Sequence, residues 1–445
     1  MIKRKRSDLL NPRMTSYVVV LCVAMATGLS YCDRVNLSVA VVFIAQELEW
    51  TSAQKARVLG SFFWGYLLSQ TLGATLAQKY GGKLVLGVAA CFWSLLTCLV
   101  PVLARSSVNS LVAGRVLLGL FEGVTFPAAF YLLRQFVDES ARSRAIALVS
   151  IGTLSGAVLS FVICPFLIER LGWDSVFYWF GGVMGPVFVL CWFYFVPETP
   201  VFVDDGHFLS VSARGGSGII TDAEEADEAE EEQEKNDNKP VSYLAMIQQR
   251  EVFAICFAHF THNLCHFALM SWLPSFLSDS LGFQGDSLAI SSLPWVVMGA
   301  SVGLSSLMAD KIIANGAYAS AVVRRAFTVG SFVCAGTSLI TLSQVSNRWL
   351  SLVLLTLAMA ANGASSAAGY EASKLDLTKT PTAASRLQSL SNTIATLGGV
   401  FGVPLVSALK GEEEDWSGVF LGLGVAFYFA ALVFYVLGRW TLATL

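Results

Sequence analysis

The chain contains repeated apolar stretches, each long enough to cross a lipid bilayer as a helix. A transmembrane helix needs about 20 mostly apolar residues, and in lipid every backbone polar group must be satisfied within the spanning structure. Only 14% of the residues are charged, against about 25% in soluble proteins. The sequence therefore predicts an all-α membrane protein with twelve transmembrane helices, near residues 15–45, 57–80, 84–104, 107–137, 144–168, 175–197, 252–279, 286–309, 319–344, 348–373, 383–410 and 416–441.

A hydrophilic segment, residues 198–251, divides these stretches into six and six. It includes the glycine-rich string SARGGSG and ten acidic residues between Asp222 and Asp237. Such a composition cannot bury a core and is typical of disorder. We therefore expect an N-terminal six-helix bundle at 1–197, a disordered acidic cytosolic linker at 198–251 and a C-terminal six-helix bundle at 252–445.

The Lys and Arg residues indicate the orientation, because cytosolic loops of membrane proteins carry an excess of them. With the N-terminus in the cytosol, that side holds sixteen, including Lys374, and the other side holds six, including Lys410. We therefore expect a multi-pass integral membrane protein whose N- and C-termini are cytosolic. The plasma membrane and an organelle membrane (plastid, vesicle or vacuole) both fit this pattern.

Arg115 and Glu122 lie inside the apolar run of residues 109–138. Seven residues apart, they project from the same helical face about 10 Å apart along the axis, and Gly119 between them leaves room on that face. An ionisable side chain at membrane depth costs at least about 2.5–3.5 kcal/mol. Two on one face indicate a polar cavity that handles a charged solute; the alternative is a structural ion pair that joins two helices.

Arg34 and Asp33 lie within the first apolar stretch. As neighbours they point about 100° apart around a helix, so they cannot share one face. Arg34 shares its face with Ser30 and Ser38. We expect Arg34 to face the cavity, with Asp33 as its companion.

The first stretch of the second half carries His259, His262 and His266, which are spaced on one helical face. Histidine is a common metal ligand, but helical spacing alone produces such triplets and no acid is expected on the same face, so we predict no metal site. Cavity lining, with one histidine titrating near neutral pH, and simple packing are the alternatives. The candidate cavity-lining residues are Asn36, Tyr66, His259, His266 and Asn392.

Six plus six spans with a cytosolic connection, together with the loop GATLAQKYGGK (73–83), resemble the major facilitator superfamily. Gln78 in this loop stands where members often carry an acid, whereas the corresponding stretch of the second half, LMADKIIANG, keeps Asp310. The resemblance implies the major facilitator fold, in which two six-helix bundles surround a central cavity.

Longer motifs are similar to those of the anion–cation symporter family, which includes plant plastid-type phosphate/anion transporters, vesicular glutamate and nucleotide transporters, and sialin. The matching strings include DRVNLSVAV (33–41), GSFFWGYLLSQ (60–70), GRVLLGLFEGVTFPA (114–128) and HNLCHFALMSWLP (262–274). Leu59 and His262 stand where the vesicular glutamate transporters usually carry His and Arg, which disfavours glutamate.

By this resemblance Arg34 and Arg115 bind the anion, His262 helps to set substrate choice, and Glu122 and Asp33 take part in cation coupling. The implied function is secondary active transport of an anion, foremost inorganic phosphate, symported with Na⁺ or H⁺ by alternating access. The alternatives are an organic-anion transporter (nucleotide, glutamate, ascorbate or sialate-like), an anion-conducting channel, and a non-transporting sensor that signals through the acidic linker.

We expect the partners to be a small anionic substrate, a coupling cation and the lipid bilayer, with no cofactor, no nucleic acid and a monomeric protein. The sequence carries no nucleotide-binding loop, no Ser/His/Asp arrangement and no phosphorylatable Asp motif. The sequence therefore does not predict an enzyme.

Overall fold

The computed structural model describes residues 12–137, 142–197, 243–378, 381–410 and 415–438, and these are almost entirely helical. The N-terminal half contains α1 (Pro12–Glu47), α2 (Ser52–Tyr80), α3 (Gly82–Ser106), α4 (Val108–Glu122), α5 (Thr125–Phe136), α6 (Arg142–Leu171), α7 (Asp174–Phe177), the π-helix η3 (Tyr178–Met184) and α8 (Gly185–Phe195). The C-terminal half contains α10 (Tyr243–Ile247), α11 (Arg250–Asp279), the 3₁₀ helix η4 (Gly285–Ser291), α12 (Ser292–Ala314), α13 (Ser320–Leu342), α14 (Arg348–Ser365), the π-helix η5 (Ser366–Tyr370), α15 (Glu371–Leu377), α16 (Pro381–Lys410) and α17 (Ser417–Leu437).

Eleven helical segments in the described part of the chain are long and apolar enough to cross a membrane. They include four spans built from consecutive helices, namely 108–136 (α4 and α5), 174–195 (α7, η3 and α8), 285–314 (η4 and α12) and 348–377 (α14, η5 and α15). The stretch expected near 57–80 forms α2 but is not among these eleven segments. It nevertheless packs as an inner helix between α4 and α16.

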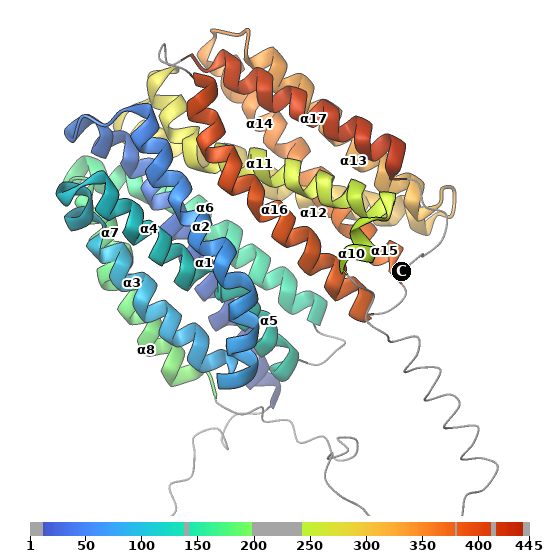
Figure 1. Ribbon diagram of the computed structural model, residues 1–445, viewed down its shortest axis with the longest axis horizontal. Helices are drawn as coiled ribbons and strands as arrows, with labels where there is room; N and C mark the ends of the chain where they lie inside the picture. Colours follow the sequence, from blue (N-terminus) through green and yellow to red (C-terminus); the bar gives the residue numbers. More distant parts are fainter. Residues whose placement is uncertain (1–11, 138–141, 198–242, 379–380, 411–414, 439–445) are drawn as a thin grey trace, which may run out of the picture.

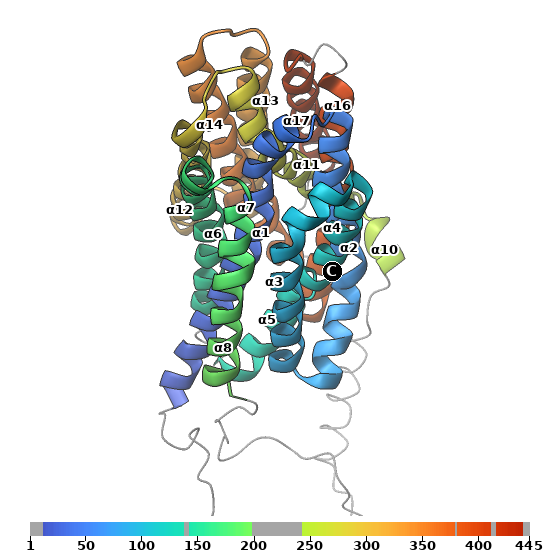
Figure 2. The ribbon, with the colours of Figure 1, turned by 90° about the vertical axis from the view of Figure 1, so that its left-hand side faces the viewer.

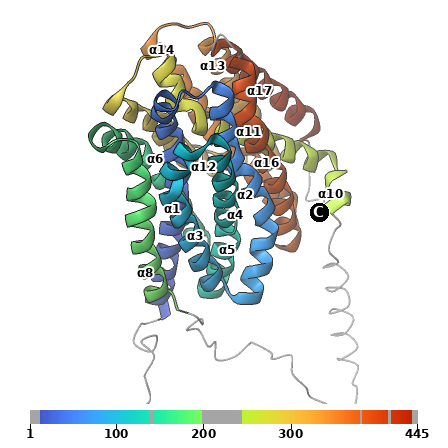
Figure 3. The same ribbon diagram turned by 60° about the vertical axis from the view of Figure 1, so that its left-hand side comes forward.

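The two sets of helices lie side by side, with α1 to α8 in blue to green and α10 to α17 in yellow to red (Figure 1). Within the halves, α1 packs on α6 and α11 packs on α16; between the halves, α2 meets α16, α6 meets η4 and α12, and α1 meets α11. Figure 3 shows α1, α2, α11 and α16 together in the middle of the molecule. The helices of the N-terminal half run nearly parallel (Figure 2).

Glycines allow neighbouring helices to touch backbone to backbone. A Cβ atom at Gly156 would lie 2.0 Å from the carbonyl oxygen of Gly28, where α6 crosses α1. A Cβ atom at Gly119 would lie 2.0 Å from the carbonyl oxygen of Phe62, where α4 crosses α2. The expectation that Gly119 leaves room for another group is therefore wrong, because the backbone of α2 fills that space.

The halves contact each other toward one end of the molecule, the end that carries the turns after α1, α3 and α11, which we call the closed end. Phe63 of α2 and Phe267 of α11 have ring centroids 4.7 Å apart. A Cβ at Gly399 of α16 would lie 2.4 Å from the Phe63 ring. At the rim, the Glu169 carboxylate accepts a hydrogen bond of 2.5 Å from the backbone N–H of Asp286.

The expected linker at 198–251 is described only in part, because 198–242 lie outside the described residues. The expected disorder is wrong for 243–247, which form α10, and α11 starts at Arg250. Apolar side chains explain the difference, since Met246 is fully buried.

Lys410 was expected in a loop but lies inside the fold at the end of α16. It is 2% exposed, its Nζ lies 3.4 Å from the Asp279 carboxylate, and it stands 4.4 Å from the ring centroid of Trp416. Loop position alone was therefore a poor guide to its surroundings.

Candidate functional site

Arg34 and Glu122 form a buried ion pair between α1 and α4. The Nε of Arg34 lies 3.2 Å from Oε2 of Glu122, and the Ser30 hydroxyl donates a hydrogen bond of 2.7 Å to the same oxygen. Arg34 is 4% exposed and Glu122 is fully buried. Glu122 ends α4, directly before the break at Gly123 and Val124 that separates α4 from α5.

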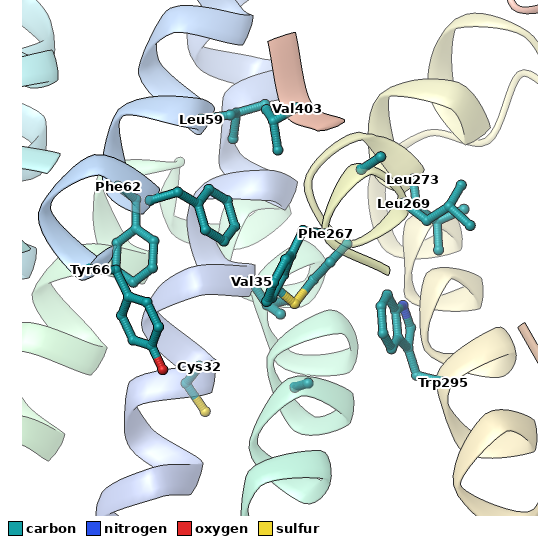
Figure 4. Close-up of a cluster of buried hydrophobic side chains, with 14 of the residues drawn as sticks. Cys32, Val35, Leu59, Phe62, Tyr66, Phe267, Leu269, Leu273, Trp295 and Val403 are labelled. Atoms are coloured by element: carbon teal, nitrogen blue, oxygen red, sulfur yellow. The ribbon is translucent and has the colours of Figure 1, made fainter. Parts of the chain in front are cut away.

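Arg34 and Arg115 both reach the same aromatic ring. The Arg34 guanidinium carbon lies 4.8 Å from the centroid of Phe62 and 4.3 Å from that of Tyr66, and the Arg115 guanidinium carbon lies 5.1 Å from Phe62. Cations in these positions are attracted to the ring face. Figure 4 shows Phe62 and Tyr66 on one side and Trp295 on the other, with Phe267 and Val35 between them. The structure thus brings Arg34 and Arg115 together, as the sequence predicted.

Arg115 and Arg34 keep unused hydrogen-bond donors in this buried position. Among the described residues, the Nε of Arg115 and the Nη2 of Arg34 have no hydrogen-bond partner, and neither has Oε1 of Glu122. Buried polar atoms are rarely left unpaired in proteins, so these atoms mark a place for a bound anion, a cation or water. The direct ion pair of Glu122 is with Arg34.

Asp33 lies on another side of α1 and is 2% exposed. Its Oδ1 accepts a hydrogen bond of 3.2 Å from Asn36, and its charge acts on Arg115 and Glu122. Asn36, expected to line a cavity, is 1% exposed, and its Oδ1 has no partner among the described residues. Asp33, Arg34, Arg115 and Glu122, the four charged residues expected inside the spans of the N-terminal half, therefore form one cluster.

His262 and His266 stack on each other in α11, with ring centroids 5.8 Å apart. His266 also stands edge-on to Trp295 at 4.9 Å, and His262 to Tyr370 at 5.7 Å. Of the two, His266 is the one close enough to Arg34 to be affected by its charge. The role of His262 in substrate choice stays a prediction.

His259 belongs to a second buried charged cluster that the sequence did not predict. Lys374 Nζ lies 2.7 Å from Oε1 of Glu371, 3.0 Å from Oε1 of Gln388 and 3.2 Å from Nδ1 of His259. Nδ1 of His259 also lies 2.7 Å from the Ser391 hydroxyl, and its Nε2 lies 3.3 Å from Glu371.

This cluster corrects two expectations. Lys374 was assigned to a loop but is 2% exposed inside α15. No acid was expected on the histidine face, but Glu371 lies there. The spacing of Glu371 and Lys374, three residues apart at the end of an apolar stretch, was the available signal. Asn392, another expected lining residue, is half-buried and follows Ser391 in α16.

The part of the chain that the structure describes contains no group of three or more His, Cys, Asp or Glu side chains able to hold a metal ion.

A further charged group lies in the C-terminal half, at the end opposite the closed end. Arg324 lies 3.3 Å from Asp376 and 3.9 Å from Asp310. Gln78, at the position in the first half that corresponds to Asp310, is exposed.

Comparison with known proteins identifies the family. The sequence profile of the Major Facilitator Superfamily matches residues 23–369. The chloroplastic ascorbate transporter of Arabidopsis thaliana is 31% identical over 416 residues, which cover 93% of this chain and 72% of that protein. The chloroplastic sodium-dependent phosphate transport protein 1 of Arabidopsis thaliana is 30% identical over 418 residues, which cover 94% of this chain and 78% of that protein.

Solved structures show the same fold. A bacterial homolog of the human lysosomal transporter Spinster, crystallised in an inward-facing and occupied conformation, superposes with a TM-score of 0.76 at 15% identity, covering 95% of this chain and 98% of that one. The D-xylose–proton symporter superposes with a TM-score of 0.72 at 14% identity, covering 95% and 98%. The protein is thus a multi-pass integral membrane protein that belongs to the major facilitator superfamily, a family of transporters and not of enzymes, and within it is related to the plastid anion and phosphate transporters of the anion–cation symporter family.

Proposed function

We propose that the protein is a secondary active transporter of small anions and that inorganic phosphate, symported with Na⁺ or H⁺, is the foremost substrate. The observation that carries this proposal is the pair of buried guanidinium groups with unpaired N–H donors. A guanidinium matches the oxygens of phosphate and carboxylate with two parallel hydrogen bonds and stays charged. The relatives named above include a phosphate transporter and an ascorbate transporter.

In this proposal Arg34 and Arg115 bind the anion, and Glu122 and Asp33 couple it to the cation. With both acids ionised, the charges of the N-terminal cluster cancel. A proton or Na⁺ on Glu122 neutralises its carboxylate and weakens the ion pair with Arg34. The guanidinium of Arg34 is then available to bind the anion. The bound anion and the bound cation then favour each other's binding, because each neutralises the charge that the other adds to the site.

The way the halves meet supports alternating access. At the closed end the contacts are aromatic and small, such as Phe63 against Phe267 and Gly399, and these surfaces can part without leaving a buried charge behind. The halves then rock around the binding residues, as in other transporters built from repeats. We propose a monomer with both termini and the acidic linker in the cytosol, and with bundle boundaries near 197 and 252.

An organic anion is the second candidate substrate. Neutral polar atoms without partners occur in the described part of the C-terminal half, at Nδ1 of His262 and His266, Nε1 of Trp295 and both amide atoms of Asn362. Inorganic phosphate bound to the arginines leaves such atoms unused, whereas a substrate with hydroxyl or carbonyl groups engages them.

Uptake into proteoliposomes tests the proposal. Radiolabelled phosphate is supplied under imposed Na⁺ or pH gradients, with glutamate, ATP, ascorbate and sialate as competitors. Arg115→Ala should abolish uptake at an unchanged protein level, and Arg115→Lys should also fail badly because a point charge loses the paired donors. Arg57→Lys, an exposed position on α2, is the matched control. Full uptake by Arg115→Ala would refute the assignment.

A further inference from the structure

The second charged cluster occupies the position in the C-terminal half that corresponds to Glu122 in the first. Glu122 lies in the fourth span of the first half, directly before the break at Gly123. Glu371 lies in the fourth span of the second half, two residues after Gly369, whose φ of −111° and ψ of −114° interrupt the helix at η5. Interrupted helices at corresponding positions of two halves are typical of transport sites, and π-helical turns often occur at functional sites.

The partners of these two glutamates also correspond. Glu122 is held by residues of α1, the first span of its half. Glu371 is held by Lys374 of its own helix and by His259 of α11, the first span of the second half. In each half, a glutamate beside a helix break therefore contacts a cationic side chain and a residue of the first span.

The hydrogen bonds of Lys374 determine how His259 carries its proton. An ammonium has three donors and no acceptor, and Lys374 has three neighbours at 2.7 to 3.2 Å, namely Glu371, Gln388 and Nδ1 of His259. Nδ1 of His259 accepts when Lys374 donates to it, and the Ser391 hydroxyl, 2.7 Å from the same atom, can donate to it as well. In this tautomer the ring hydrogen is on Nε2, 3.3 Å from Glu371. The imidazole is then neutral, and Nδ1 is its one site left for a proton.

We propose that His259 and Glu371, arranged around Lys374, form a proton-binding site in the C-terminal half that loads and unloads during the transport cycle. The Lys374 ammonium already occupies the place between the oxygens of Glu371 and Gln388 that a metal cation would need. A proton is the cation that can still be added. Solvent reaches the cluster through Glu371, which has 28% of its side chain exposed, and Gln388, which is exposed.

The proton acts by loosening α15 from its neighbours. When the imidazole of His259 is charged, its Nδ1–H points at the Lys374 ammonium. Two hydrogen-bond donors then face each other, so His259 and Lys374 must separate. On Glu371, the added proton removes the charge that holds Lys374. The groups facing His259 are Glu371, Lys374 and Tyr370 from η5 and α15, Ser391 from α16, and His262 from α11 itself. Gln388 of α16 and Cys256 of α11 lie beside Lys374. Each route weakens the contact of α15 with α11 and α16, next to the break at Gly369.

The inference rests on the proposed function for the role of the proton in transport, but its first test does not need a substrate. Thermal unfolding of the purified full-length protein in detergent is followed by tryptophan fluorescence from pH 5.5 to 8.5. The wild type should lose stability as the pH falls, because the folded site opposes the added proton more than the unfolded chain does. His259→Gln should reduce this dependence in the window where histidine titrates, whereas Arg57→Lys, which leaves every histidine in place, should keep it.

A wild-type pH profile in His259→Gln would overturn the proposal. If His259→Gln does not fold, His259→Asn serves as the second variant, since it also removes the imidazole that accepts the proton. It should reduce the pH dependence in the same window, and an unchanged profile would again overturn the proposal.

The second test measures phosphate exchange in proteoliposomes with equal pH on both sides, from pH 5.5 to 8.5. The exchange rate of the wild type should change with pH, in part because phosphate itself titrates in this range. The change across the range should be at least twofold smaller in His259→Gln than in Arg57→Lys, whatever the absolute rates. The same pH dependence in these two variants would refute the role in the transport cycle. If no phosphate exchange occurs in the wild type, the proposed function fails, while the unfolding measurements still decide whether the site binds a proton.

Discussion

Replacing Gly119 with alanine tests whether the close approach of α2 and α4 positions the anion-binding residues. A Cβ at this position would lie 2.0 Å from the Phe62 carbonyl oxygen and 2.9 Å from the Tyr66 nitrogen. Both are backbone atoms, so no side-chain rotation relieves the clash. Ordinary contact begins at 3.4 Å, and α4 must therefore move by at least 1.4 Å (3.4 − 2.0).

This movement acts on both charged residues of α4. Arg115 lies about one turn before Gly119 and Glu122 about one turn after it, and the distance of 3.2 Å between Arg34 and Glu122 leaves little room for a shift. Overpacking of this kind costs about 1–3 kcal/mol. If the strain falls on the anion-bound arrangement, the apparent affinity drops by roughly 5- to 150-fold, at about 1.4 kcal/mol per factor of ten.

The assay is initial phosphate uptake over a range of phosphate concentrations, normalised to the amount of reconstituted protein. The matched control is Gly114→Ala on the same helix, where a Cβ would meet the Cδ1 of Leu103 at 2.6 Å. That atom ends a flexible side chain that can rotate away. The reasoning is refuted if Gly119→Ala and Gly114→Ala show the same half-saturating concentration and the same rate.

Three further outcomes are expected. Glu122→Gln should uncouple transport, so that an imposed Na⁺ or pH gradient no longer drives accumulation; gradient-driven accumulation at the wild-type level would count against its coupling role. Glu169→Ala should speed labelling of a Leu59→Cys reporter by an impermeant thiol reagent in a cysteine-free background, by no more than about fivefold, because an exposed polar contact is worth at most about 1 kcal/mol; unchanged labelling would show that this contact does not hold the closed end. Asp376→Asn should lower the unfolding temperature by removing the partner of Arg324, whereas Asp310→Asn, at 3.9 Å, should have the smaller effect; the reverse order would contradict the geometry.

The helical architecture could be predicted because length and apolar character alone determine which segments cross the bilayer. The convergence of Arg34, Arg115 and Glu122 could also be predicted, since no lipid-facing position tolerates these charges. The choice of partners could not. Glu122 meets Arg34 and not Arg115 because the approach of α4 to α2, through Gly119, sets the direction of each side chain.

The cluster around Lys374 was beyond prediction for a different reason. Apolar character falls toward the end of the fourth span of the second half, so Lys374 resembled the start of a cytosolic loop and Glu371 the inner end of the span. The helix continues instead through η5 into α15 and carries both residues back against α11 and α16. Only tertiary packing reveals that His259 has an acid beside it.

The backbone contact of Gly28 with Gly156 has a mechanical consequence. Where two helices touch through carbonyl oxygens, with no side chains between them, neither can slide or rotate without a steric collision. This contact makes α1 and α6 move as one rigid unit. Conformational change during a transport cycle is then concentrated in the aromatic contacts and loops that connect such rigid units. Substitutions in these connections should therefore alter turnover rates more than substitutions within a rigid unit.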